Sequence, residues 1–171
     1  MPLSMHRISI PVFKQSLSAL SSVLKKAETY CSENNIDTKD LLQKRLAPDM
    51  FTLTQQIQRA TFHAAQAAAK LAGIDNPEFE DKETSFSDLQ QRINYTIEIL
   101  NQFDAKQFEG SENRPLEVQT RVGIISFIGQ DFLLHFAIPQ FLFHVTTAYG
   151  IIRNAGVEVG KRDFIGNSDD R

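Results

Sequence analysis

The four histidines of this chain, His6, His63, His135 and His144, are the residues with the widest chemical use. A neutral imidazole is a common metal ligand and a common general base. His135 and His144 lie about 900° apart along a straight helix, on opposite sides, although Pro139 offers a kink. Two interpretations stay open. Either one histidine packs inside the protein and the others are partly exposed, or His144 holds a divalent metal, zinc or nickel, with His135 or His63.

A second candidate is the pair Gln140 and His144, which are four residues apart and therefore share one face of a helix. Their neighbours in sequence are apolar, so each polar group needs a partner. Gln56 and Gln58 flank the apolar stripe of an earlier helix and are the partners that we expect inside the protein. These four residues either line a small-molecule pocket or form a buried hydrogen-bond network that fixes the register of the helices.

The common catalytic motifs are absent from the sequence. There is no GxGxxG, P-loop, GxSxG or HExxH pattern, so no catalytic residue is identified. Cys31 is the single cysteine, which excludes an intramolecular disulfide, and no cationic cluster lies near it to activate the thiol. The acidic run at 78–83 is interpreted as a solvated loop.

Length and composition indicate one domain over 1–171, with about the last five residues mobile. The residues are 42% hydrophobic and 23% charged, close to the average for globular proteins. The net charge of −3 argues against a nucleic-acid-binding surface. The start lacks a signal-peptide pattern, and polar residues interrupt the longest apolar stretch, 132–152. We therefore expect a cytoplasmic protein that does not span a membrane.

The spacing of apolar residues predicts helices that would position these side chains. Four are long and one is short: 5–34, 38–45, 50–73, 86–103 and 130–155. Thr52 with Gln55 fits a capping box, with Asp49 as the alternative cap. Ser87 with Gln90 fits a second capping box. Four long helices predict an all-α four-helix bundle.

One segment departs from the helical pattern. Residues 116–120 alternate apolar and polar side chains, and 124–128 are β-branched and aromatic, with Gly123 near the turn between them. This pattern predicts a small hairpin at 116–128, between the third and fourth long helices.

The helix predicted at 130–155 is apolar around most of its circumference. In a single bundle such a helix would leave more apolar surface exposed than soluble monomers usually carry. The hairpin, the tail at 157–166 or a second subunit could cover this surface. We expect a homodimer through this helix, because a two-fold interface needs only one self-complementary patch.

Several segments resemble a bacterial and fungal family of unknown function in the DinB-like superfamily. They are LAPDMF at 46–51, FIGQDFLLHFAIPQF at 127–141, FHVTTAY at 143–149 and GKRDFIG at 160–166. The resemblance implies a DinB-like four-helix bundle that is often dimeric. It also implies a divalent metal held by three histidines, one from the second helix and two from an HxxxH on the last helix. Some characterised members of the superfamily are metal-dependent thiol transferases.

This sequence departs from the three-histidine pattern. His144 falls at the position of the last ligand, but Gln140 stands four residues before it, and the position on the second helix falls near Gln58. The first hypothesis is therefore a small-ligand-binding or non-catalytic DinB-like protein with a degenerate metal site. The alternative is a divalent-metal-dependent transferase or hydrolase that uses His144 with His135 or His63. A module that binds only other proteins is a third possibility.

Overall fold

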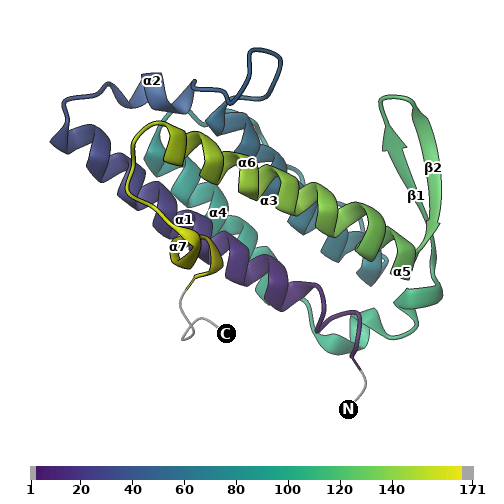
Figure 1. Ribbon diagram of the computed structural model, residues 1–171. Helices are drawn as coiled ribbons and strands as arrows, with labels where there is room; N and C mark the ends of the chain where they lie inside the picture. The colour runs from purple at the N-terminus through teal and green to yellow at the C-terminus, as the bar shows by residue number, and fades with distance from the viewer. Residues whose placement is uncertain (1–2, 167–171) are drawn as a thin grey trace.

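Four long helices form the body of the protein in a computed structural model that describes residues 3–166 (Figure 1). They are α1 (Ile10–Glu33), α3 (Leu53–Ala72), α4 (Phe86–Asn101) and α6 (Ile138–Asn154). Around the bundle the order is α1, α4, α3, α6, so α3 lies between α4 and α6. The predicted all-α bundle with one small hairpin is confirmed. The predicted mobility of the last five residues concerns a part of the chain outside the described range.

Shorter elements connect and cover the bundle. They are α2 (Thr38–Leu42), η1 (Ala105–Phe108), η2 (Ser111–Asn113), β1 (Pro115–Thr120), β2 (Gly123–Ile128), α5 (Gly129–Asp131), η3 (Phe132–Ala137) and α7 (Lys161–Ile165). The C-terminal part of the chain folds back along α1, where Lys26 and Asp163 form an ion pair of 2.7 Å. The tail therefore covers part of the bundle. Within residues 3–166, none of the helices combines the length and apolar character that a membrane span requires.

Small side chains on α3 bring it close to α6. Ala60, Ala64 and Ala68 are fully buried, and α3 lies directly against α6. Larger residues fill the rest of the core, where Phe13 and Phe141 meet edge to face with ring centroids 5.0 Å apart. A close approach of two helices lets polar side chains from both reach one another. This seam is where the candidate site lies.

The ends of the helices follow capping rules. Thr52 and Gln55 form the predicted capping box of α3, and Gly73 ends that helix with a positive φ of 74°. The predicted cap of α4 at Ser87 and Gln90 is wrong. The structure uses Ser85, whose hydroxyl accepts from the Asp88 backbone N–H, while the Asp88 carboxylate accepts from the Ser85 N–H. The helix therefore begins at Phe86, the first residue of the predicted range, and this side chain is buried in the core.

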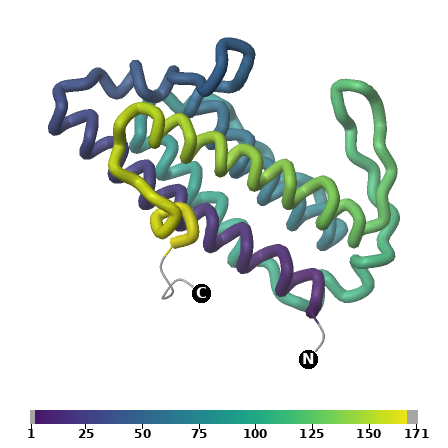
Figure 2. Tube along the Cα trace, in the orientation of Figure 1, coloured from purple at the N-terminus to yellow at the C-terminus, as the bar shows by residue number. Residues whose placement is uncertain are grey.

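The predicted hairpin at 116–128 is confirmed. β1 and β2 pair in antiparallel register, with Val118 opposite Ile125 and Thr120 opposite Gly123. The strands project from the helices, as the trace in Figure 2 shows. One face of the hairpin reaches the core through Val118, which is buried, and through Phe127, which packs against Phe132 and Phe136.

The long helix predicted at 130–155 is not one regular α-helix. Its first part, η3, is a π-helix, and α6 follows from Ile138. Pro139 has no N–H to donate to the carbonyl four residues earlier, which favours a wider turn just before it. The segment is also not buried all round, since Leu134 and Phe143 remain 43% and 54% exposed.

Candidate functional site

Two histidines from different helices meet at the seam between α3 and α6. The rings of His63 on α3 and His144 on α6 are nearly parallel, with an interplanar angle of 8° and centroids 5.4 Å apart. Phe51 stacks near the His144 ring at 6.3 Å, and Phe143 meets that ring edge-on at 5.3 Å. His144 is buried, whereas His63 is half-buried and Phe143 is exposed. The site therefore reaches from the core to the protein surface.

Gln56 fixes the tautomer of His144. The Gln56 side-chain amide donates from Nε2 to the backbone carbonyl of Phe51 at 3.3 Å, and a carbonyl oxygen can only accept. Gln56 Oε1 therefore faces His144 Nδ1, at 2.7 Å, so Nδ1 carries the proton and donates it. The Nε2 atom of His144 is then left with a lone pair. It can accept a hydrogen bond or coordinate a cation.

Both imidazoles are neutral at pH 7. Burial lowers the pKa of His63 from 6.5 to about 4, with smaller effects from His144 and from the positive charge of Arg59. Burial also lowers the pKa of His144 from 6.5 to about 4, again helped by Arg59. The pair thus presents two neutral rings beside one permanent cation.

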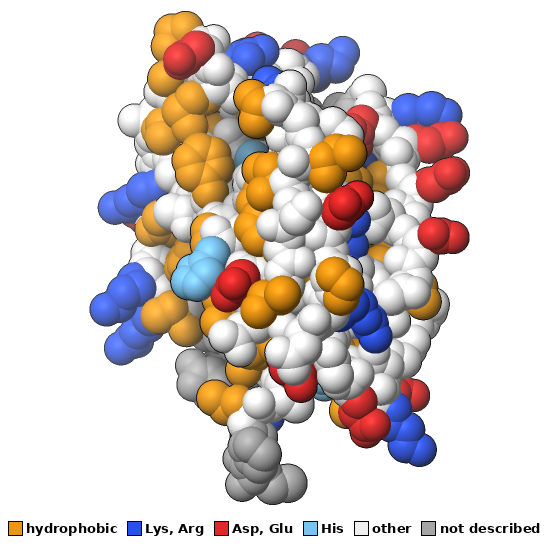
Figure 3. All heavy atoms as spheres, turned by 90° about the vertical axis from the view of Figure 1, so that its right-hand side faces the viewer, with side chains coloured by type: hydrophobic (Ala, Val, Ile, Leu, Met, Phe, Trp, Pro, Cys, Tyr) orange, Lys and Arg blue, Asp and Glu red, His pale blue; other side chains and the backbone are white. Residues whose placement is uncertain are grey.

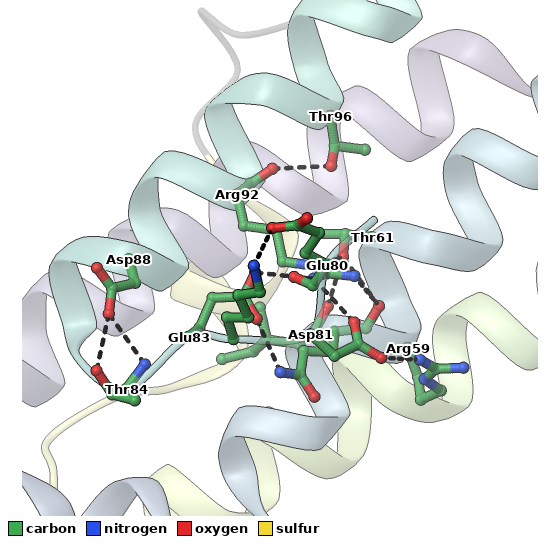
Figure 4. Close-up of polar contacts among 12 residues, drawn as sticks. Arg59, Thr61, Glu80, Asp81, Glu83, Thr84, Asp88, Arg92 and Thr96 are labelled. Atoms are coloured by element: carbon green, nitrogen blue, oxygen red, sulfur yellow. Dashed lines mark hydrogen bonds and ion pairs between the residues drawn. The ribbon is translucent and has the colours of Figure 1, made fainter. Parts of the chain in front are cut away.

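Arg59 connects this pair to a second polar cluster on the other side of α3. Its guanidinium lies 5.2 Å from the centre of the Phe62 ring and forms an ion pair of 2.6 Å with Asp81. Asp81 also pairs with Arg92 of α4 at 3.0 Å. The segment 78–84, predicted as a solvated loop, is therefore tied to the bundle by two arginines (Figure 4).

Arg92 is the centre of that second cluster. Its side chain is only 3% exposed and pairs with Glu83 at 2.8 Å. It also donates to Thr61 Oγ1 at 2.7 Å and to the Gln58 carbonyl at 3.2 Å. The Phe79 ring packs 4.6 Å from the guanidinium. No buried polar side-chain atom within residues 3–166 lacks a hydrogen-bond partner, so this buried charge is fully compensated.

The structure brings together some of the predicted site residues and separates others. His144 and Gln56 are bonded to each other, and His63 joins them, whereas Gln58 donates to Glu83 at 2.8 Å in the other cluster. Gln140 is half-buried in the first turn of α6.

The remaining candidates lie elsewhere in the fold. His135 is exposed in η3, and Cys31 is buried with a pKa raised by burial. His6 bonds to the Phe103 carbonyl at 3.2 Å near the N-terminal end of the chain. None of these three side chains is therefore part of the seam between α3 and α6.

Arg59, Glu83 and Arg92 were not predicted from the sequence as residues of a polar cluster. A signal for Arg92 exists, because it stands between Leu89 and Thr96 on the face of α4 that is otherwise apolar or small. An arginine at such a position needs a buried carboxylate partner. The acidic run at 78–83 supplies several carboxylates in one segment shortly before this helix.

The three-histidine metal site implied by the resemblance does not fit these residues. Only His63 and His144 come together, and the residue four positions before His144, where the resemblance implies a further histidine, is Gln140. Within residues 3–166, no three or more His, Cys, Asp or Glu side chains lie together in a way that could hold a metal ion. Amide oxygens are poor ligands for zinc and nickel compared with imidazole.

The arrangement of four helices with a hairpin before the last one defines a DinB-like bundle. A crystal structure of a DinB family member from Shewanella denitrificans is 34% identical to this chain, covers 95% of it and 92% of its own length, and superposes with a TM-score of 0.90. The chain belongs to the family described as "Domain of unknown function (DUF1993)", which matches residues 5–165. No curated protein matches the chain at a significant level.

Proposed function

We propose that the protein is a non-catalytic member of its family that binds a small molecule at the His63–His144 pair. The observation that carries the proposal is the hydrogen bond between Gln56 and His144, which leaves Nε2 of a neutral imidazole with a lone pair. Nε2 has no hydrogen-bond partner within residues 3–166, and it is not among the fully buried atoms that lack a partner, so a molecule from solvent can reach it. The bond to Gln56 uses Nδ1 alone.

The chemistry of the site selects the class of ligand. A lone pair on Nε2 accepts a hydrogen bond from an O–H or N–H group. The flat rings of His63, Phe51 and Phe143 offer faces and edges to a planar molecule. We therefore expect the ligand to be a small planar molecule with a hydrogen-bond donor. It would bind where the positive charge of Arg59 acts on the histidine rings.

A second candidate function is a divalent-metal-dependent transferase or hydrolase that uses His144 with His63. One observation favours it: a metal-binding histidine usually donates its other nitrogen to a neighbouring group, as His144 does to Gln56. The combination with His135 has no such support, since His135 is exposed and about 13 Å further along the helix axis at 1.5 Å per residue.

Metal content separates the two candidates. Untagged protein is titrated with ZnCl₂ and NiCl₂ in a calorimeter and then dialysed and analysed for bound metal. We expect well below one metal per chain for the wild type. One zinc or nickel per chain that is lost in His144→Ala and kept in the control His135→Ala would establish the second candidate and overturn the first.

Ligand binding is tested by a thermal-shift screen of planar molecules that carry hydroxyl or amide donors. We expect hits that raise the Tm of the wild type and of His135→Ala but not of His144→Ala. Hits that persist unchanged in His144→Ala would place binding elsewhere and contradict the proposed site.

A further inference from the structure

The outer edge of β2 is a free backbone edge. The sheet has two strands, so each strand has one side without a neighbour. The free side of β1 faces α3, because Lys70 Nζ donates to the Glu117 carbonyl at 2.8 Å. Within residues 3–166, no backbone hydrogen bond from another element reaches residues 123–127 of β2.

The register identifies which backbone groups point outward. Thr120 and Gly123 are the pair that closes the two-residue turn, and hydrogen-bonded and open pairs alternate from there along an antiparallel hairpin. Glu117 and Ser126 form an open pair, which agrees with the outward Glu117 carbonyl. Ile124 and Ser126 therefore direct their N–H and C=O groups to the free edge. The Ile128 N–H points the same way, while the Ile128 carbonyl is at the N-cap of α5 and accepts the first hydrogen bond of that helix.

This edge lacks the features that normally prevent pairing with another chain. Natural edge strands carry charges, prolines or bulges, but β2 reads GIISFI, with neither a charge nor a proline. Its apolar side chains remain open to water: Ile124 is 63% exposed and Ile128 is 43% exposed, next to Val122 at the tip. Hydrophobic side chains gather on the face of the molecule that carries the hairpin (Figure 3).

We infer that β2 pairs antiparallel with β2 of a second copy of this chain, about a two-fold axis at Ser126. The result is one continuous four-stranded sheet, β1–β2–β2–β1. In this register Ile124 lies opposite the partner's Ile128, and Ile125 lies opposite the partner's Phe127. Every cross-strand pair except the central serines is apolar, which is the favourable composition for a half-buried sheet.

Charge complementarity supports the same partner. In an antiparallel pair the tip of each hairpin reaches the base of the other. Arg121 is exposed at the tip and Asp131 is exposed at the base, and neither forms an ion pair within residues 3–166. The two-fold axis at Ser126 brings each Arg121 towards the partner's Asp131, twice per dimer.

This interface differs from the one predicted along the helix at 130–155. That helix is covered by α3 on one side and leaves only Leu134 and Phe143 strongly exposed among its large apolar side chains. The hairpin edge offers both unpaired backbone and apolar side chains. We therefore place the homodimer at the hairpin.

Sedimentation velocity with a matched pair of proline variants tests the interface. Ser126→Pro removes an N–H that points outward, so the hairpin of one chain keeps its hydrogen bonds while pairing with a second copy is blocked. The control Glu117→Pro also removes one outward N–H, but on the outer side of β1, which is not the proposed interface. At about 100 µM, above the range in which small interfaces dissociate, we expect wild type and Glu117→Pro at twice the 19.3 kDa chain mass and Ser126→Pro as a monomer. A monomeric wild type, or a dimeric Ser126→Pro with an unchanged circular dichroism spectrum, would overturn the inference.

A disulfide tests the position of the axis without depending on the proline variants. Antiparallel residues in a hydrogen-bonded pair have Cα atoms about 5.5 Å apart, within disulfide range. Under oxidising conditions Ser126→Cys should give a covalent dimer on a non-reducing gel, while Gln119→Cys should not, because three strand spacings of about 4.8 Å would separate the two copies. The native Cys31 is buried. Equal cross-linking of both variants, or of neither, would contradict the proposed axis.

Discussion

Two polar clusters flank α3, and they use their polar groups in opposite ways. On the side of α4, Arg92 has its charge paired with Glu83 and its other donors bonded to Thr61 and to backbone carbonyls. On the side of α6, His144 uses one nitrogen for Gln56 and keeps a lone pair on the other. The first cluster is complete within the chain and holds segment 78–84 in place. The second has an unused acceptor, which is what a binding site requires.

Removing Arg92 should have the largest effect on stability. Arg92→Met leaves Glu83 and the Gln58 carbonyl without their cation, and breaking a buried ion pair from one side costs about 3–5 kcal/mol of unfolding free energy. Urea denaturation measures the loss. The control Lys82→Met removes an exposed ion pair with Glu80 and should change stability by less than about 0.5 kcal/mol. Equal effects of both variants would show that the Arg92 cluster does not anchor the segment.

The histidine pair should make stability depend on pH in a defined window. The folded pKa of each ring is lowered from 6.5 to about 4, so the unfolded chain takes up protons first as the pH falls. The neutral rings contribute fully to the free energy of unfolding above pH 6.5, and this contribution is lost between pH 6.5 and 4. At pH 5 the loss is about 2 kcal/mol for each ring. Asp88 and Asp163 have pKa values lowered from 3.8, so their losses begin only below that pH.

Urea denaturation at pH 7 and pH 5 checks this window. His144→Gln should remove about half of the stability difference between the two pH values, whereas the exposed control His135→Gln should leave it unchanged. A wild-type protein equally stable at both pH values would contradict the neutral, desolvated state of the pair.

Gln56 should have a smaller effect that reports on the tautomer. Gln56→Leu leaves His144 Nδ1 and the Phe51 carbonyl without partners and should cost about 1.5 kcal/mol. It should also weaken any ligand that donates to Nε2, because the ring can then carry its proton on either nitrogen. Gln66→Leu, on the same helix and half-buried, is the matched control. An unchanged ligand affinity in Gln56→Leu would show that binding does not depend on the tautomer of His144.

The smallest effect should come from Arg59, which belongs to both clusters. Arg59→Gln removes a cation that lowers the pKa of both histidines, so the pKa values of both rings should rise. The unfolding free energy should change by less than about 1 kcal/mol, since the Arg59–Asp81 pair is partly exposed. NMR titration of the ring protons measures the shift. A lower pKa in this variant would show that Arg59 acts through structure rather than charge.

Local rules were enough to predict the elements. The Thr52 cap and the alternation that marks the hairpin each depend on a few neighbouring residues. Helix 130–155 was predicted less well, because the widened turn before Pro139 depends on how the backbone compensates for the missing N–H.

Only part of the candidate site could be predicted, because the contacts of its side chains depend on tertiary packing and not on neighbouring residues. Gln56 or Gln58 could be expected near His144, because each is a polar residue beside an apolar stripe, but the sequence left open which of the two. Gln58 and His63 could not be assigned, because their partners depend on the rotation of α3 between α4 and α6. The Arg92 cluster depends on a loop that folds back onto the bundle, and its sequence has the composition of an exposed segment.

The protonation state of His144 is the most direct test of the proposed site. Long-range ¹H–¹⁵N spectra of protein with labelled histidines distinguish a protonated from an unprotonated ring nitrogen. At pH 7 we expect His144 to show a protonated Nδ1 and an unprotonated Nε2, with a titration midpoint at about 4. A proton on Nε2 would leave no lone pair there for a ligand and would contradict the proposed function. A midpoint at or above 6.5 would contradict the desolvated, neutral state of the ring on which the site is built.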